Sequence, residues 1–172
     1  MFEIDISNRQ QAVPIDRDAI RAAVLRGLQM EQVDSAVLSI SIVDNLTIHT
    51  LNRHHLHHDY PTDVISFQLD FSHGDVVQSP DVDESRMLRA ARAAIEGEII
   101  ASAEMAATMA DHGGWSAHDE LTLYVIHGLL HVCGYDDLSD EEQAFMRARE
   151  RAILGSLGLK AVYDEDTELP RD

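Results

Sequence analysis

The sequence predicts an α+β fold in which a small four-stranded sheet packs with five or six helices. Three observations support this class: four short segments have the pattern of strands, helical segments are interleaved with them, and the chain closes with three successive helices. A doubly wound sheet would instead alternate strands and helices to its end. At 172 residues the chain suits one domain. We expect that domain to span residues 1–163 and a disordered acidic tail to cover 164–172.

The strands are predicted from alternating apolar and polar residues. The segments "FEIDIS" at 2–7 and "VLSISIV" at 37–43 show this alternation clearly. A third strand is expected in "DYPTDVISFQL" after a turn at Pro61, and "GEIIAS" at 97–102 is the fourth. The polar region between them predicts a surface excursion, with a helix around 84–94.

The helices are predicted from apolar spacing and capping residues. Pro14 can open a first helix, and Asp44 can cap a short second one. The segment at 103–114 should be a helix that ends at its glycine pair. Ser116 begins a helix that is apolar nearly all round to Gly134 and is therefore expected to be buried; Ser139 begins the last helix, through about Leu157. The apolar positions of the first helix are Ile20, Ala23, Val24, Gly27 and Leu28.

The charge balance limits the possible partners. The net charge is −18, from 13 basic and 31 acidic residues, so the bulk surface repels nucleic acid and any RNA binding must be local. Acidity of this kind is equally typical of a well-solvated surface. No segment approaches the roughly 18 apolar residues of a membrane span, and the N-terminus lacks a signal-peptide pattern. The single cysteine, Cys133, excludes internal disulfides. We therefore expect a cytoplasmic protein without a membrane partner.

Two histidines and an aspartate in "IHGLLHVCGYDD" have the spacing of a metal site. His127 and His131 lie one turn apart on one face of the buried helix, so their imidazoles can converge on one ion. Gly134 can adopt a left-handed conformation that returns the chain and brings Asp137 within reach as a third ligand. Three protein ligands leave the fourth position open, as in catalytic zinc sites. The alternative is a pair of core histidines that are hydrogen-bonded to the backbone.

The neighbours of these residues refine the interpretation. Cys133 lies off the histidine face and is interpreted as a small buried hydrophobe, not a ligand. Tyr135 and Asp136 can support the ligands or merely form the turn. In zinc peptidases of the HExxH type, a glutamate directly after the first histidine deprotonates the metal-bound water. Gly128 occupies that position and has no side chain to do so, which disfavours peptide hydrolysis.

Four segments together resemble the motifs of one known family. They are "HGLLHVCGYD" at 127–136, Leu51-Asn52 followed by "PTDVISF" at 61–67, "GEI" at 97–99 and "DEL" at 119–121. The family is YbeY, the bacterial rRNA maturation endoribonucleases, and the similarity covers most of residues 44–150. Its fold is a small mixed sheet with helices on its sides. The resemblance therefore implies a mixed sheet and a metal site on the buried helix, opening into a cleft beside the Pro-Thr-Asp strand.

The resemblance also implies a function. It implies a single-strand-type endoribonuclease that acts in 16S rRNA 3′-end maturation and ribosome quality control, by metal-assisted phosphodiester cleavage. The implied partners are the rRNA of the small ribosomal subunit, a small-subunit ribosomal protein and the GTPase Era, with no DNA. One ion is expected on His127, His131 and Asp137. Two imidazoles and a carboxylate suit Zn²⁺, and they also suit nickel, iron or manganese.

Two positions depart from the family pattern. Asp137 stands where the family usually has a third histidine, and aspartate is also a competent zinc ligand. Leu56 aligns with an arginine thought to engage RNA phosphate. Arg53 or a nearby histidine can supply the missing cation, or these histidines are solvated and inert. The candidate bases are Asp63 and Glu98, or hydroxide on the metal, although Asp63 can instead only cap its turn. The nearby histidines are His54, His55, His57 and His58.

Two other functions stay open at the level of sequence. One is a non-catalytic ribosome-assembly factor with a structural metal, because an acidic surface suits a basic ribosomal protein better than naked RNA. The other is a metal-dependent hydrolase of a different substrate.

Overall fold

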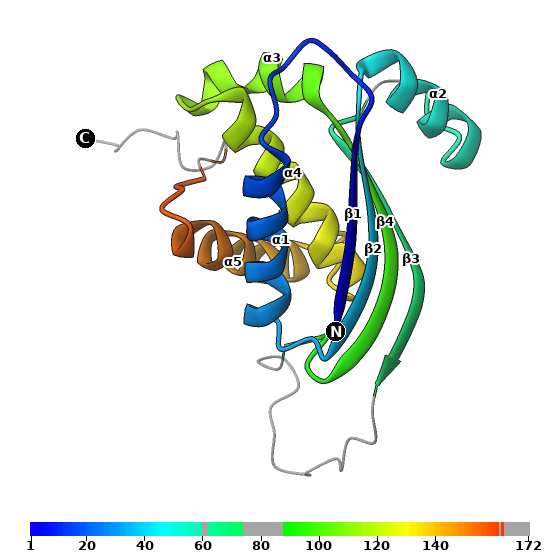
Figure 1. The fold of residues 1–172 in the computed structure, drawn as a ribbon, viewed down its shortest axis with the longest axis vertical. Coiled ribbons are helices and arrows are strands. Elements are labelled where there is room, and N and C mark those ends of the chain that lie inside the picture. Colours follow the sequence, from blue (N-terminus) through cyan, green and yellow to red (C-terminus); the bar gives the residue numbers. More distant parts are fainter. Residues whose placement is uncertain (60–61, 74–87, 162, 164–172) are drawn as a thin grey trace.

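The computed structural model describes residues 1–59, 62–73, 88–161 and 163, and it confirms the predicted α+β fold (Figure 1). The strands are β1 (Phe2–Asn8), β2 (Ser35–Val43), β3 (Val64–His73) and β4 (Ala93–Ser102). The helices are α1 (Arg17–Met30), α2 (Asn45–His55), α3 (Ala103–Gly113), α4 (Ala117–Val132) and α5 (Asp140–Ser156).

The four strands form one mixed sheet in the order β1-β2-β4-β3. β1, β2 and β4 are parallel, and β3 pairs antiparallel with β4. The register of β3 shifts between Gln68 and Asp70, where the strand bulges. The mixed sheet that the family resemblance implied is confirmed.

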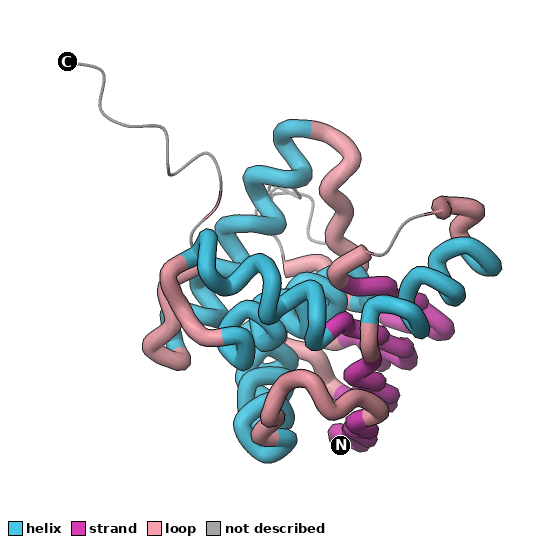
Figure 2. The backbone as a smooth tube through the Cα atoms, turned by 90° about the horizontal axis from the view of Figure 1, so that it is seen from above, coloured by secondary structure: helices cyan, strands magenta, loops and turns pink. Residues whose placement is uncertain are grey.

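The helices cover the two faces of the sheet unequally. Figure 2 shows the strands as one layer with most helices gathered on one side and α2 on the other. α2 packs through Ile48 against Ile65 and Ile100 on its own face. The larger core lies between the opposite face and the helices α1, α4 and α5, with Ile40, Ile99 and their neighbours fully buried. Successive residues of β4 therefore point to opposite sides of the molecule.

Helix α4 packs closely on the sheet because Gly128 of α4 faces a side chain of β4 and Gly97 of β4 faces a side chain of α4. A Cβ added to Gly128 would lie 2.8 Å from Cγ2 of Ile99, and one added to Gly97 would lie 2.6 Å from Cγ1 of Val132. Neither position has space for a side chain without a shift of its neighbour. This close contact fixes which face of α4 is buried against β4.

Most predicted helix ends agree with the structure, but the start of α1 does not. All five predicted apolar positions of α1 are buried. The helix begins at Arg17, however, because the Asp16 carboxylate accepts hydrogen bonds from the amides of Asp18 and Ala19; the predicted opening at Pro14 is wrong. Ser102, Ser116 and Ser139 cap α3, α4 and α5 in the same way, and Gly114 ends α3 with a φ of 68°.

The predicted helix around 84–94 is wrong in its described part. Residues 88–92 form turns and Ala93 begins β4, whose pairing with β2 overrides the helical propensity of the alanines. Residues 84–87 lie outside the described residues, as do the predicted turn at Pro61 and the predicted tail at 164–172. Within the described chain, no helix combines the length and apolar character needed to cross a bilayer.

Candidate metal centre

The C-terminal half of α4 and the turn after it bring two histidines and an aspartate together. His127 and His131 are one helical turn apart, and Gly134 has a φ of 91°, the left-handed conformation that returns the chain. The ligand atoms of His127, His131 and Asp137 all lie within 4.8 Å of one another. The three side chains are thus positioned to share one ion.

Hydrogen bonds fix the orientation of both imidazoles. Nδ1 of His127 lies 2.5 Å from Oε1 of Glu150, and Nδ1 of His131 lies 3.0 Å from the carbonyl oxygen of Tyr135. Because both partners can only accept, each Nδ1 carries the hydrogen, and each Nε2 presents a lone pair. The two Nε2 atoms and a carboxylate oxygen of Asp137 therefore form a triangle of acceptors that requires a cation or a shared proton.

The dimensions of this triangle fit a zinc ion. The Nε2 atoms are 3.0 Å apart, and Oδ2 of Asp137 lies 3.6 Å from Nε2 of His127 and 3.8 Å from Nε2 of His131. Tetrahedral ligands about 2.0–2.1 Å from zinc stand about 3.3–3.4 Å from one another. The donor set of two imidazoles and one carboxylate is also one that zinc accepts in catalytic sites.

Glu150 on α5 is a residue of this site that the sequence analysis missed. Its carboxylate is 2% exposed, accepts from His127 through Oε1, and accepts from the Tyr163 hydroxyl through Oε2. Burial by itself lowers the pKa of His127, but the hydrogen bond and the negative charge of Glu150, with Asp63 and Asp137, raise it above its usual value. A signal was present in the sequence, since Glu150 shares a helix face with the apolar Met146 and Leu154.

A second buried carboxylate supports the other histidine through Tyr135. Glu31 is fully buried, accepts a hydrogen bond from the Tyr135 hydroxyl at 2.5 Å, and is paired with the Arg149 guanidinium at 2.8 Å. Burial and Glu31 raise the pKa of the Tyr135 hydroxyl, which therefore stays a donor. The network holds the backbone whose carbonyl orients His131. Tyr135 therefore supports a predicted ligand and is more than a turn residue.

The centre opens into a cleft of about 470 Å³ between α3, α4 and α5. These three helices can be followed in Figure 1. The lining residues are Thr62, Asp63, Met105, Met109, Glu120, Leu123, Tyr124, His127, Asp137, Gln143, Met146, Arg147, Glu150 and Tyr163. The residues at the start of β3 that resemble the second family motif thus reach the same cleft as the metal centre.

Of the three predicted catalytic residues, the structure brings only Asp63 to this cleft. Asp63 is close enough to raise the pKa of His127, and its Oδ1 also accepts from the Val64 amide at 2.8 Å, as a turn cap does. Glu98 lies on the opposite face of the sheet, since its neighbours on β4, Gly97 and Ile99, face α4. The sheet therefore separates the Glu98 carboxylate from the metal centre.

Arg53 does not line the cleft. Its side chain on α2 is 63% exposed, and its guanidinium lies 3.9 Å from Asp59. Leu56 caps the end of the same helix and is 44% exposed. Among the nearby histidines, His55 packs edge-on against Phe67. Neither Arg53 nor His55 is among the residues that line the cleft, whereas Arg147 of α5 is.

The positions of Gly128 and Cys133 explain why neither supplies chemistry. Gly128 faces Ile99 at a distance that excludes a side chain, so the missing glutamate reflects the close packing of α4 on β4. Cys133 is buried, burial raises the pKa of its thiol, and its sulfur is not one of the converging ligand atoms. The prediction that Cys133 is a buried hydrophobe agrees with its environment.

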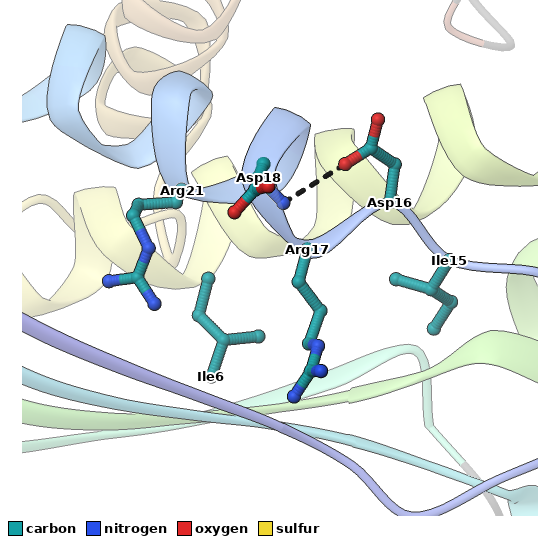
Figure 3. Close-up of a pocket in the computed structure, with 6 residues that line it drawn as sticks. All are labelled: Ile6, Ile15, Asp16, Arg17, Asp18 and Arg21. Atoms are coloured by element: carbon teal, nitrogen blue, oxygen red, sulfur yellow. Dashed lines mark hydrogen bonds between the residues drawn. The ribbon is translucent and has the colours of Figure 1, made fainter.

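Another hollow, of about 570 Å³, lies between the start of α1 and β1 (Figure 3). Its charged groups are two arginines and two aspartates, and Asp16 is already engaged as the cap of α1. The guanidinium of Arg21 donates to the carbonyl of Ile4. Its residues are not part of the metal-ligand group found in the described part of the chain, which is His127, His131 and Asp137.

Comparison with known proteins identifies close similarity to one family. The family model described as Endoribonuclease YbeY matches residues 5–158. The chain is 35% identical over 154 residues to Endoribonuclease YbeY of Rhodopirellula baltica, covering 88% of this chain and 70% of that protein. It is 34% identical over 158 residues to Endoribonuclease YbeY of Bacillus licheniformis, covering 91% and 95%. A Thermotoga maritima protein with a known solution structure shares the fold, with a TM-score of 0.52 at 19% identity and 92% of each chain covered.

Proposed function

The chain belongs to the YbeY family of endoribonucleases, and we propose that it is a metal-dependent hydrolase of RNA phosphodiester bonds. The observation that carries this proposal is the triangle formed by His127, His131 and Asp137, whose ligand atoms all lie within 4.8 Å of one another. Two of the three ligands also line a cleft. A substrate in that cleft would lie directly beside the ion.

Some residues of the site would bind the ion, and others orient the residues that bind it. His127, His131 and Asp137 would hold one Zn²⁺, which polarises a phosphoryl oxygen and lowers the pKa of bound water when it is present. Glu150 and the Tyr135 carbonyl keep both Nδ1 atoms protonated and both Nε2 atoms directed at the ion. Such orientation holds the ligands in place before substrate arrives.

Asp63 is the best placed candidate for the proton acceptor. Its carboxylate lines the cleft beside His127, whereas Glu98 lies behind the sheet and Arg53 on the exposed side of α2. A carboxylate at this position can accept the proton that the attacking oxygen loses. Phosphodiester cleavage does not require protonation of an amine leaving group, so it demands less of such a base than peptide hydrolysis does.

We further propose that the substrate is the 3′ end of 16S rRNA, in the cytoplasm. Because the net charge is −18, RNA must be held by local contacts at the centre or presented by basic proteins of the ribosome. A small-subunit ribosomal protein and the GTPase Era are the partners proposed for that presentation, and ribosome quality control is the proposed wider role.

The test is a substrate panel with zinc-loaded protein. We expect cleavage of an RNA fragment that spans the 3′ end of 16S rRNA, and loss of cleavage on chelation and in His127→Ala. Peptides and simple phosphodiesters should be cut slowly or not at all. Preferential cleavage of peptides would contradict the proposal.

The acidic surface and the exposed Leu56 favour a second candidate, a ribosome-assembly factor whose metal is structural. It predicts tight binding to small-subunit components without metal-dependent cleavage of the rRNA fragment. The same panel, accompanied by a binding measurement with the isolated subunit, separates the two functions.

A further inference from the structure

The cleft beside the metal centre is larger than a phosphate group requires. Its volume of about 470 Å³ extends from His127 and Asp137 toward α3 and α5. Sites that enclose one small molecule have volumes of about 300–1,000 Å³. The cleft can therefore accept one nucleoside but not a stack of base pairs.

One side of the cleft is apolar and adaptable. Three of the six methionines of the chain line it, Met105 and Met109 from α3 and Met146 from α5, together with Leu123 and Tyr124 from α4. Met109 is 39% exposed, so part of its side chain is accessible from the cleft. Methionine side chains are unbranched and polarizable, and they fit flat aromatic groups of different shape.

Tyr124 contributes a neutral surface to this wall. Burial, the negative charges of Glu120 and Asp63, and a hydrogen bond with Glu120 raise the pKa of its hydroxyl. Glu120 also accepts from the Trp115 indole at 2.6 Å, so its carboxylate is already engaged. The hydroxyl of Tyr124 therefore stays neutral, and the residue, which is 5% exposed, adds no charge to the wall.

The charges of the cleft exclude an RNA backbone along its length. Four carboxylates line the cleft, against one guanidinium, that of Arg147, which lies over the Tyr163 ring at 4.9 Å. A chain of phosphates placed there would be repelled, whereas an uncharged base would not. The carboxylates are those of Asp63, Glu120, Asp137 and Glu150.

We propose that this cleft binds one unpaired nucleobase, from a nucleotide that flanks the phosphodiester bond to be cut. The phosphate lies at the metal centre and the base turns into the cleft, against Met105, Met109, Leu123 and Tyr124. Because the wall is formed by apolar and methionine side chains, the subsite accepts all four bases with little discrimination. This inference rests on the proposed endoribonuclease activity and assigns the recognition of the substrate to α3 and α4.

The test combines a change in the protein with a change in the RNA. A short RNA with one cleavage site is prepared intact and with an abasic ribose at each position in turn. Stacking of one base on an aromatic side chain contributes roughly 1–3 kcal/mol in single-strand binding proteins, so loss of the occupying base should lower kcat/KM by roughly 5-fold or more. We expect this loss at one of the two positions that flank the cleaved bond.

Met109→Ala should lower kcat/KM severalfold on intact RNA and have no effect on the abasic RNA, because the contact is already gone. Leu46→Ala, at a residue that is 75% exposed on α2, is the matched control and should behave as wild type on both RNAs. An equal effect of Met109→Ala on both RNAs would overturn the proposal, as would indifference to every abasic position.

A binding measurement tests the base subsite independently of RNA cleavage. Zinc-loaded protein is titrated into a fluorescently labelled RNA in which an uncleavable linkage replaces the phosphodiester bond to be cut, either intact or abasic. Weaker binding of the abasic RNA supports the base subsite even if the protein cuts no RNA. Equal binding of the intact and abasic RNAs refutes the base subsite. Cleavage of the intact, cleavable RNA would still support the proposed endoribonuclease activity.

Discussion

Glu150→Gln tests whether the buried carboxylate of Glu150 on α5 increases the affinity of the metal centre for zinc. The substitution keeps the shape of the side chain and an acceptor oxygen for Nδ1 of His127, but it removes the negative charge. The carboxylate is 2% exposed and its hydrogen bond to His127 is 2.5 Å long, so little solvent screens the interaction. The change therefore lowers the basicity of His127 while it leaves its hydrogen bond and all three proposed ligands intact.

The magnitude follows from comparable sites. Loss of an outer hydrogen-bond partner of a metal-bound histidine typically costs about 10–100-fold in metal affinity, or about 1.4–2.7 kcal/mol. We expect a value toward the lower end, because glutamine keeps a hydrogen bond to Nδ1 and only the charge that strengthened it is lost. The Tyr163 hydroxyl can accept from the new amide as readily as it donated to the carboxylate, so the fold should be retained.

The assay is competition for zinc between the protein and a chromophoric chelator near neutral pH. Glu141→Gln makes the same chemical change at an exposed position in the first turn of α5 and should bind zinc as wild type does. If Glu150→Gln binds zinc within about 2-fold of wild type, or if both variants lose affinity equally, the positioning role of Glu150 is refuted.

Three further predictions concern packing, ligand identity and pH. Gly128→Glu, which recreates the peptidase motif, should destabilise the protein by at least about 1–3 kcal/mol in urea unfolding, since Ile99 leaves no room for a Cβ; unchanged stability together with peptidase activity would contradict the packing argument. Asp137→His should retain one zinc ion per chain by elemental analysis, whereas Asp137→Ala should bind weakly; full occupancy in the alanine variant would remove Asp137 from the ligand set. In the metal-free protein, the raised pKa of His127 contributes stability that is complete below pH about 6.5 and is lost as the pH rises through the folded-state pKa. The free energy of unfolding of wild type relative to Glu150→Gln should therefore fall as the pH rises from 6 to 8.5, and a constant difference would count against the pairing.

The part of the site that lies within one local segment was predictable from sequence. The spacing of His127 and His131 places them on one face of a helix, and Gly134 has the left-handed φ that the return of Asp137 requires. These features depend on helix geometry and on the conformational freedom of glycine, which act over a few residues.

The part that depends on tertiary packing was not predictable in the same way. Glu150 lies 23 residues from His127, and only the packing of α5 on α4 joins them. Glu98 was a candidate base because it lies in a motif that resembles one of the family's. The strand has apolar residues on both faces, Ile99 and Ile100, so its pattern does not reveal which face meets α4. Likewise, the pairing of β4 with β2 replaced the helix that the alanine-rich segment at 90–94 suggested.

The most direct test of the central claim is the single-turnover rate of rRNA-fragment cleavage, measured while metal-free protein is titrated with zinc. If His127, His131 and Asp137 hold the ion that acts on RNA, the rate should rise from near zero and saturate at one zinc per chain. His131→Ala should stay near zero throughout. Full cleavage without bound zinc, or by His131→Ala, would contradict the account.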